Sequence, residues 1–166
     1  MELQNYQEAI YNNKLRRNFN TTDVGKEIIL MTEELGEFCD AYLEADKEEI
    51  IDAFGDIMVY GLGLTAMFGW NANQIVNANP EYKQKPTQLL EHLPYLVKSI
   101  GSIAKTFKKS NKELLPNLNH QEKFQTNIGN LLGYCIKAIE FTGETYKSVL
   151  ESIIENNTTR THQGKI

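Results

Sequence analysis

The apolar residues of segments 23–45 and 47–69 recur at intervals of three and four, and this spacing constrains the fold more than any other feature of the chain. Side chains at such intervals share one face of an α-helix, whereas a half-buried β-strand would alternate polar and apolar residues. Residues 21–23 and Asp46 offer N-cap oxygens before the two segments, and Gly69 follows as a C-terminal stop. Because the connection between the segments is short, we expect an antiparallel pair of helices.

The rest of the chain also shows helical spacing and few strand signals, so we predict an all-α protein. Further helices are expected over residues 6–19, 71–79, 87–109, 123–143 and 144–157. Pro94 should kink or restart the helix in which it lies, because proline has no N–H to donate and its ring clashes with the preceding turn. With 166 residues, the chain is long enough for a single domain with a substantial core.

An internal repeat appears when the chain is aligned with itself at an offset of 74 residues. Residues 55–76 then lie over residues 129–150, with matched glycine, tyrosine and aliphatic positions: Gly55 with Gly129, Tyr60 with Tyr134, Gly69 with Gly143, and Ile57, Met58 and Leu62 with Leu131, Leu132 and Ile136. We therefore predict a duplicated helical unit, with repeats over residues 22–83 and 85–157, packed as a pseudo-twofold bundle. A chance match between two amphipathic helices is the alternative.

Composition and charge exclude several classes of function. The net charge of -5 argues against a nucleic-acid partner unless a cation lies between the two. The N-terminus lacks the basic start and apolar run of a signal peptide, and no uncharged apolar run is long enough to span a membrane. Cys39 and Cys135 lie far apart in sequence, which favours reduced thiols. We expect a cytoplasmic protein that binds neither membrane nor nucleic acid.

Residues 31–61 are rich in apolar side chains but also contain ten carboxylates, and six of these are candidate site residues: Glu33, Glu34, Glu37, Glu49, Asp52 and Asp56. On one predicted helix Glu37 shares a face with Glu33 or with Glu34, and on the next the last three of these residues share a face. Carboxylates held together at a core boundary repel one another and lose hydration unless a cation compensates them. Mg²⁺ is the natural cation because it prefers oxygen ligands and often binds phosphate as well, and Mn²⁺ is the second candidate. A solvated helix face is the alternative.

The second repeat has lost these acids. At the offset of 74, Lys123, Thr126 and Asn130 stand in place of Glu49, Asp52 and Asp56. We therefore expect the first repeat to carry the chemistry and the second to be a degenerate copy.

The run "EELGE" followed by "EIIDAFGD" and "IMVYGLGLTAMFG" resembles the MazG-type all-α nucleoside triphosphate pyrophosphohydrolases, whose signature is EExxE, a loop and ExxD. The motif is most similar to that of members resembling phosphoribosyl-ATP pyrophosphohydrolase. The resemblance covers roughly residues 22–83. The resemblance implies catalytic roles for Glu33, Glu34 and Glu37. It implies that the metal ligands are Glu34, Glu37, Glu49, Asp52 and Asp56. Two registers of the ExxD pair stay open: Glu49 with Asp52, or Asp52 with Asp56.

The resemblance also implies a reaction, the Mg²⁺-dependent cleavage of an NTP or dNTP to the monophosphate and pyrophosphate. Candidate phosphate ligands on the chain are Lys14, Arg17, Lys26, Asn79 and Lys83. The C-terminal "NNTTRTHQGK" resembles a family segment N-x-x-K followed by Gly, which implies that Asn157 and Arg160 contact phosphate. A dUTP/dCTP-type substrate and a phosphoribosyl-ATP-type substrate stay equally open.

Two further questions follow from the repeat and its acids. The chain is expected to be a homodimer, or a monomer whose two repeats imitate the dimer of single-copy relatives. The alternative to an enzyme is a non-catalytic nucleotide- or partner-binding helical module with the same fold. The intact acids of the first repeat favour the enzyme.

Overall fold

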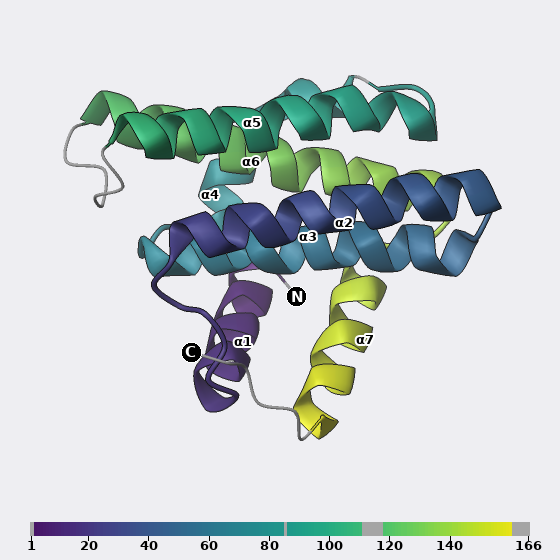
Figure 1. Cartoon of the computed structure of the whole chain (residues 1–166), viewed down its shortest axis with the longest axis horizontal. Coiled ribbons are helices and arrows are strands. Elements are labelled where there is room, and N and C mark those ends of the chain that lie inside the picture. Colours follow the sequence, from purple (N-terminus) through teal and green to yellow (C-terminus); the bar gives the residue numbers. More distant parts are fainter. Residues whose placement is uncertain (1, 85, 111–117, 161–166) are drawn as a thin grey trace.

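The structure, a computed structural model, describes residues 2–84, 86–110 and 118–160. Its helices are α1 (Leu3–Arg16), α2 (Val24–Glu44), α3 (Lys47–Met67), α4 (Ala72–Asn77), α5 (His92–Lys109), α6 (Leu118–Phe141) and α7 (Tyr146–Thr159), with two 3₁₀ turns, η1 (Pro80–Lys83) and η2 (Leu89–Glu91) (Figure 1). The described part of the chain contains no β-strand, which confirms the predicted all-α class.

The predicted caps of the two long helices are present. The Asp23 side chain accepts a hydrogen bond from the Lys26 backbone N–H (3.1 Å), and Asp46 accepts from the N–H groups of Glu48 (3.0 Å) and Glu49 (3.2 Å). Gly69 has a positive φ of 68°, the left-handed conformation that glycine adopts without strain at a helix end. These caps fix both ends of the α2–α3 hairpin, as its sequence predicts.

The helix expected to begin at residue 87 is divided, and its predicted start is wrong. Residues 89–91 form the separate turn η2, and α5 begins at His92. Pro94 therefore lies in the first turn of α5, where backbone N–H groups have no partner within the helix and a missing donor costs little. Of the two predicted effects of Pro94, a kink or a restart of the helix, the structure shows the restart, because a new helix begins at His92.

Four long helices make the centre of the molecule. In Figure 1, α5 and α6 form an upper layer and α2 and α3 a lower layer, and α3 packs on α6 between them. The hairpin partners α2 and α3 are joined through the rings of Phe38 and Phe54, whose centroids lie 4.7 Å apart. This packing holds the acidic faces of α2 and α3 in a fixed register.

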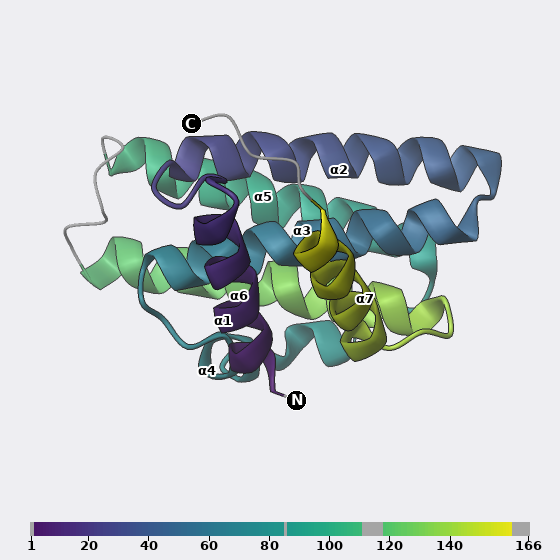
Figure 2. The same ribbon diagram turned by 90° about the horizontal axis from the view of Figure 1, so that it is seen from below.

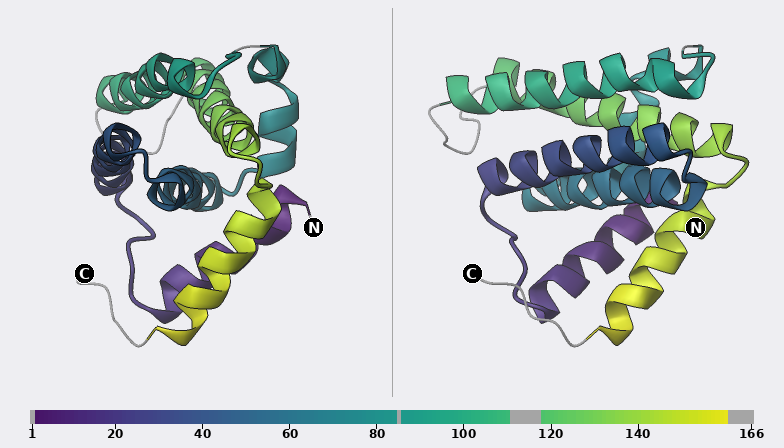
Figure 3. Two further views of the ribbon diagram at one scale, coloured as in Figure 1. Left: turned by 90° about the vertical axis from the view of Figure 1, so that its right-hand side faces the viewer. Right: turned by 45° about the vertical axis from the view of Figure 1, so that its right-hand side comes forward.

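The helices α1 and α7 lie outside this bundle. Both run away from the free side of α3 and lie next to each other, as Figures 2 and 3 show. The Tyr6 hydroxyl donates to Glu151 (2.7 Å) and so links the two helices near the bundle. Together, α1 and α7 enclose a space against α2 and α3.

α3 is the core helix of the fold. By length and composition alone it could span a membrane, but 61% of its most apolar window is buried inside the protein. Phe54, Ile57, Met58 and Leu62 are fully buried against the other helices. The apolar character of α3 is therefore explained by its central position.

Close contacts at glycines on α6 generate a prediction of stability. A Cβ added at Gly129 would lie 2.6 Å from the Ile75 carbonyl oxygen, which is backbone and cannot rotate away, so Gly129→Ala should lower the free energy of unfolding by about 1–3 kcal/mol. Gly101 on α5 has open space around it, and Gly101→Ala should raise the free energy of unfolding by about 0.5–1 kcal/mol. Urea denaturation of both variants measures the difference. Equal effects of the two substitutions would contradict the packing of α4 on α6.

Candidate functional site

Five carboxylates gather where α2 and α3 face each other, and we call Glu33, Glu34, Glu37, Asp52 and Asp56 the acidic cluster. Glu34 is buried, with 8% of its surface exposed, and Asp56 is half-buried. The other three are exposed at the edge. The antiparallel packing of two helices with acids three and four residues apart brings them together, as the sequence predicts.

The mutual repulsion of the acidic cluster is visible in its ionisation. Burial raises the pKa of Glu34 to about 8, and the charges of Asp56, Glu37, Asp52 and Glu33 add to the rise. Because this value lies above neutral pH, Glu34 holds a proton in the metal-free protein at pH 7.

Asp56 is perturbed in the same direction. Burial raises its pKa to about 7, and the charges of Asp52 and Glu37 contribute, whereas Arg160 opposes the rise. Perturbed acids of this kind, in contact with a cavity, mark a candidate functional site.

The chemistry of the cluster fits a hard divalent cation. All its donors are carboxylate oxygens, which Mg²⁺ and Mn²⁺ accept, and a bound cation would offset both the burial and the repulsion that raise the two pKa values. Among the residues that the structure describes, no three Asp, Glu, His or Cys side chains converge closely enough to hold a metal as they stand. Ligation therefore requires side-chain rotation in α2 and α3.

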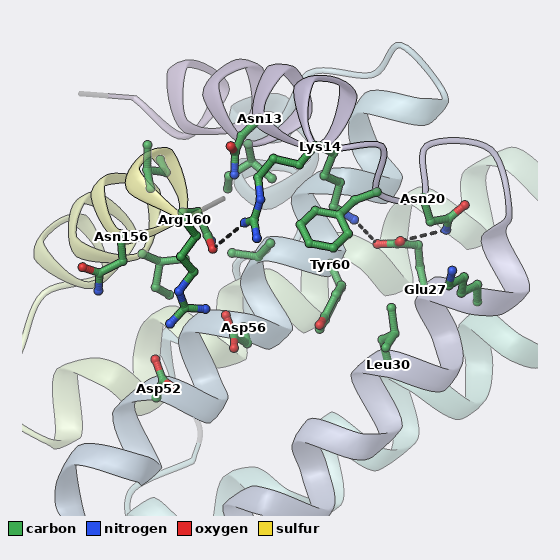
Figure 4. A pocket seen from close by; sticks show the side chains of 18 residues that line it. Asn13, Lys14, Asn20, Glu27, Leu30, Asp52, Asp56, Tyr60, Asn156 and Arg160 are labelled. Atoms are coloured by element: carbon green, nitrogen blue, oxygen red, sulfur yellow. Dashed lines mark hydrogen bonds and ion pairs between the residues drawn. The ribbon is translucent and has the colours of Figure 1, made fainter. Parts of the chain in front are cut away.

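Beside the cluster lies a cavity of about 540 Å³ enclosed by α1, α2, α3, α7 and the loop after α1 (Figure 4). Asp52 and Asp56 belong both to the acidic cluster and to the cavity wall. Apolar side chains of Ile10, Leu30, Val59 and Ile153 line much of the rest. The cavity thus combines an acidic wall with an apolar interior, which suits a ligand with a charged and an apolar part.

The lining of the cavity also includes basic side chains. Arg17, Lys26 and Arg160 all line it, and in Figure 4 Arg160 lies next to Asp52 and Asp56. The Arg17 guanidinium donates to the Asn157 side-chain oxygen (2.9 Å), which ties the end of α1 to α7. The predicted phosphate ligands that line the cavity are therefore Lys14, Arg17, Lys26, Asn157 and Arg160.

Lys14, another predicted phosphate ligand, is engaged within the protein. Its Nζ lies 2.5 Å from the Glu27 carboxylate, and both side chains are buried. Burial lowers the pKa of Lys14, while the Glu27 charge opposes that shift. The Asn20 side chain donates to the other Glu27 oxygen (2.8 Å). This network fixes the loop between α1 and α2 at one end of the cavity.

Sequence reasoning missed Glu27 as a residue of the site. Glu27 lies seven residues before Glu34, so the two share a face of α2, and this spacing is the signal that could have identified it. A buried carboxylate at the first turn of a helix resembles an ordinary charge near the helix N-terminus. Only the fold shows that Lys14 neutralises it.

Asn79 and Lys83 are not brought to this cavity. The Asn79 side chain donates to the Ile75 carbonyl (3.1 Å), and the Lys83 carbonyl accepts from Lys137 (3.2 Å). The physical reason is the path of the chain, because α4 and η1 turn away from the acidic cluster and pack on α6. Glu49 likewise lies in the first turn of α3 and does not line the cavity.

Comparison with known proteins agrees with this arrangement of acids on two helices. Residues 2–78 match the family model described as phosphoribosyl-ATP pyrophosphohydrolase. No curated protein and no solved structure gives a significant match to the chain. The matched segment includes α1 to α4 and the whole acidic cluster. Residues 2–78, just under half of the chain, therefore match a family of the MazG-like nucleoside triphosphate pyrophosphohydrolase superfamily.

Proposed function

We propose that the protein is a divalent-cation-dependent nucleotide pyrophosphohydrolase, which cleaves the α–β anhydride bond of an NTP, dNTP or related nucleotide to give the monophosphate and pyrophosphate. The observation that carries the proposal is the position of Asp52 and Asp56, which join the acidic cluster to a cavity that basic side chains also line. The charge of a triphosphate is neutralised by cations, and such a cavity combines protein cations with carboxylates that can hold a metal ion.

Glu34, Glu37, Asp52 and Asp56 would hold Mg²⁺ in this proposal. When bound, Mg²⁺ supplies charge neutralisation for the phosphates and a water of lowered pKa. We favour the register in which Asp52 and Asp56 are the second acidic pair, because both line the cavity and Glu49 does not. Glu49 is then an outer residue that orients its neighbours.

The remaining residues of the chain position the substrate. Arg160 and Lys26 lie on the cavity wall where they can bind phosphate oxygens, and the Arg17–Asn157 hydrogen bond holds α7 in place for this contact. Glu33, exposed at the edge of the acidic cluster, is the candidate to take a proton from the attacking water. The apolar lining and the Tyr60 ring are available to the nucleoside part.

Substitution of one acid in the first repeat is the direct test. Asp56→Asn and Glu37→Gln should each lower turnover by at least about a hundredfold, because each removes a charged metal ligand while keeping the side-chain shape. Asn130→Asp is the matched control at the equivalent position of the second repeat and should leave activity nearly unchanged. Pyrophosphate release over a panel of common and modified nucleotides with Mg²⁺ measures all three.

Two outcomes of that assay would contradict the proposal. Full activity of Asp56→Asn would remove the acidic cluster from the chemistry. Nucleotide binding without turnover in the wild type would favour a non-catalytic binding module.

The raised pKa values predict how pH acts on stability. The folded metal-free protein keeps protons on Glu34 and Asp56 that the unfolded chain has lost, so the free energy of unfolding should fall as pH rises from about 4.5 towards 8. Glu34→Gln should make this fall smaller. Thermal unfolding of both proteins in the presence of a chelator, from pH 5 to pH 8, measures it. An identical pH dependence of the two proteins would contradict the assignment.

Mg²⁺ must displace the same protons, so its effect should depend on pH in the opposite way. Millimolar Mg²⁺ should raise the melting temperature more at pH 8 than at pH 6, with each kcal/mol of binding energy worth roughly 2–4 °C in a domain of this size. Differential scanning fluorimetry gives the two shifts. A melting temperature that Mg²⁺ and Mn²⁺ leave unchanged, with and without nucleotide, would remove the main support for the metal site.

A further inference from the structure

The two short helices α4 and α7 do not pack on the long helices that precede them in the chain. α4 follows α3 but packs mainly on α6, and α7 follows α6 but packs mainly on α1 and α3. In Figure 1, α4 accordingly lies beside α6, whereas α7 extends from the side of α3. Each short helix therefore packs on long helices from the other half of the chain.

The contacts between long and short helices correspond at matched positions of the two repeats. A Cβ added at Gly55 would lie 2.6 Å from Ile153 Cδ1 and 2.8 Å from Val149 Cγ1, both on α7. A Cβ added at Gly129 would lie 2.8 Å from Ile75 Cγ2 on α4 and 3.1 Å from the Asn79 side-chain nitrogen. The offset of 74 converts 55 to 129, 75 to 149 and 79 to 153. The two glycines at equivalent positions are thus contacted by residues at equivalent positions. In each case the contacting residues belong to the other repeat.

Helix ends also correspond. Gly69, between α3 and α4, has φ 68°, and Gly143, between α6 and α7, has φ 89°. Both glycines have left-handed backbone conformations at the same aligned position. The turn from the long helix to the short helix is therefore alike in the two repeats. A chance similarity of two amphipathic helices does not require matched turns and matched crossed contacts.

Part of the surface of α6 that corresponds to the cavity wall of α3 is filled. Gly133 stands where Val59 lines the cavity, and a Cβ at residue 133 would collide with the ring of Tyr82, which is buried. Tyr134 stands in place of Tyr60 and packs on Tyr95, with ring centroids 4.8 Å apart. Aromatic side chains therefore cover the part of α6 that matches the Val59 and Tyr60 wall, whereas Thr126, the counterpart of Asp52, still lines an open pocket.

We propose that the chain consists of two equivalent halves that have exchanged their short helices, so that α7 of the second half completes the nucleotide site of the first, while η1 of the first half closes the counterpart site with Tyr82. The role of α7 in binding nucleotide rests on the proposed function; the exchange itself does not. One working site per chain follows.

The exchange explains which phosphate ligands reach the acidic cluster. Asn157 is the counterpart of Lys83 at the offset of 74. Without exchange, η1 would bring Lys83 to the acids of its own half, whereas with exchange α7 brings Asn157 and Arg160. A role of Arg160 in phosphate binding would therefore indicate the exchanged arrangement, whereas a role of Lys83 would indicate the arrangement without exchange.

Kinetics of the full-length chain with Mg²⁺ and its best-cleaved nucleoside triphosphate tests the assignment. Arg160→Ala should raise KM about tenfold with a smaller change in kcat, and Arg160→Lys should restore part of the loss because it keeps the charge. Lys83→Ala is the matched control and should leave KM within about twofold of the wild type. A tenfold rise of KM in Lys83→Ala with no change in Arg160→Ala would overturn the exchange.

A second measurement needs no nucleotide and separates failure of the exchange from failure of the proposed function. Gly55→Ala should lower the melting temperature, and at least half of this loss should disappear in the Ile153→Ala background, whereas Asn79→Ala should relieve none of it. If Gly55→Ala does not fold alone, recovery of folded protein in the Gly55→Ala/Ile153→Ala double variant is the same positive result. Relief by Asn79→Ala and none by Ile153→Ala would show that each short helix stays in its own half.

Discussion

Burial of carboxylates between α2 and α3, together with their mutual repulsion, is the constraint on which the candidate site depends. Packing of Phe38 on Phe54 holds the two helices together, and this contact forces Glu34 and Asp56 into a space with too little water for two charges. In the metal-free protein both carboxyl groups therefore hold their protons more tightly than free carboxyl groups do. Under the proposed function, this arrangement prepares a cation site at the expense of stability, and a bound cation would recover that energy.

The part of the cavity lining that lies away from α2 and α3 is formed by α1 and α7. α1 and α7 cover α3, and the hydrogen bond from Arg17 to Asn157 joins them over the cavity. The family match ends at residue 78, so it does not include α7, although Arg160 lies beside the acids in space. The cavity, which we propose to be the substrate site, is thus lined by residues from both halves of the chain.

Much of this fold follows from local rules in the sequence. The caps at Asp23 and Asp46, the stop at Gly69 and the acidic faces of α2 and α3 all depend on residues within a few positions of one another. The errors arise where distant contacts decide. The sequence predicts Asn79 and Lys83 as phosphate ligands, but they do not reach the cavity because α4 and η1 pack on α6. The role of Glu27 depends on Lys14, which only the folded chain brings to it.

The most direct test of the account is the identity of the products. In ³¹P NMR spectra of a nucleotide incubated with the full-length protein and Mg²⁺, the account predicts equal amounts of nucleoside monophosphate and pyrophosphate, with no orthophosphate, and no conversion when a chelator replaces Mg²⁺. Release of orthophosphate, or conversion that continues without a divalent cation, would contradict it.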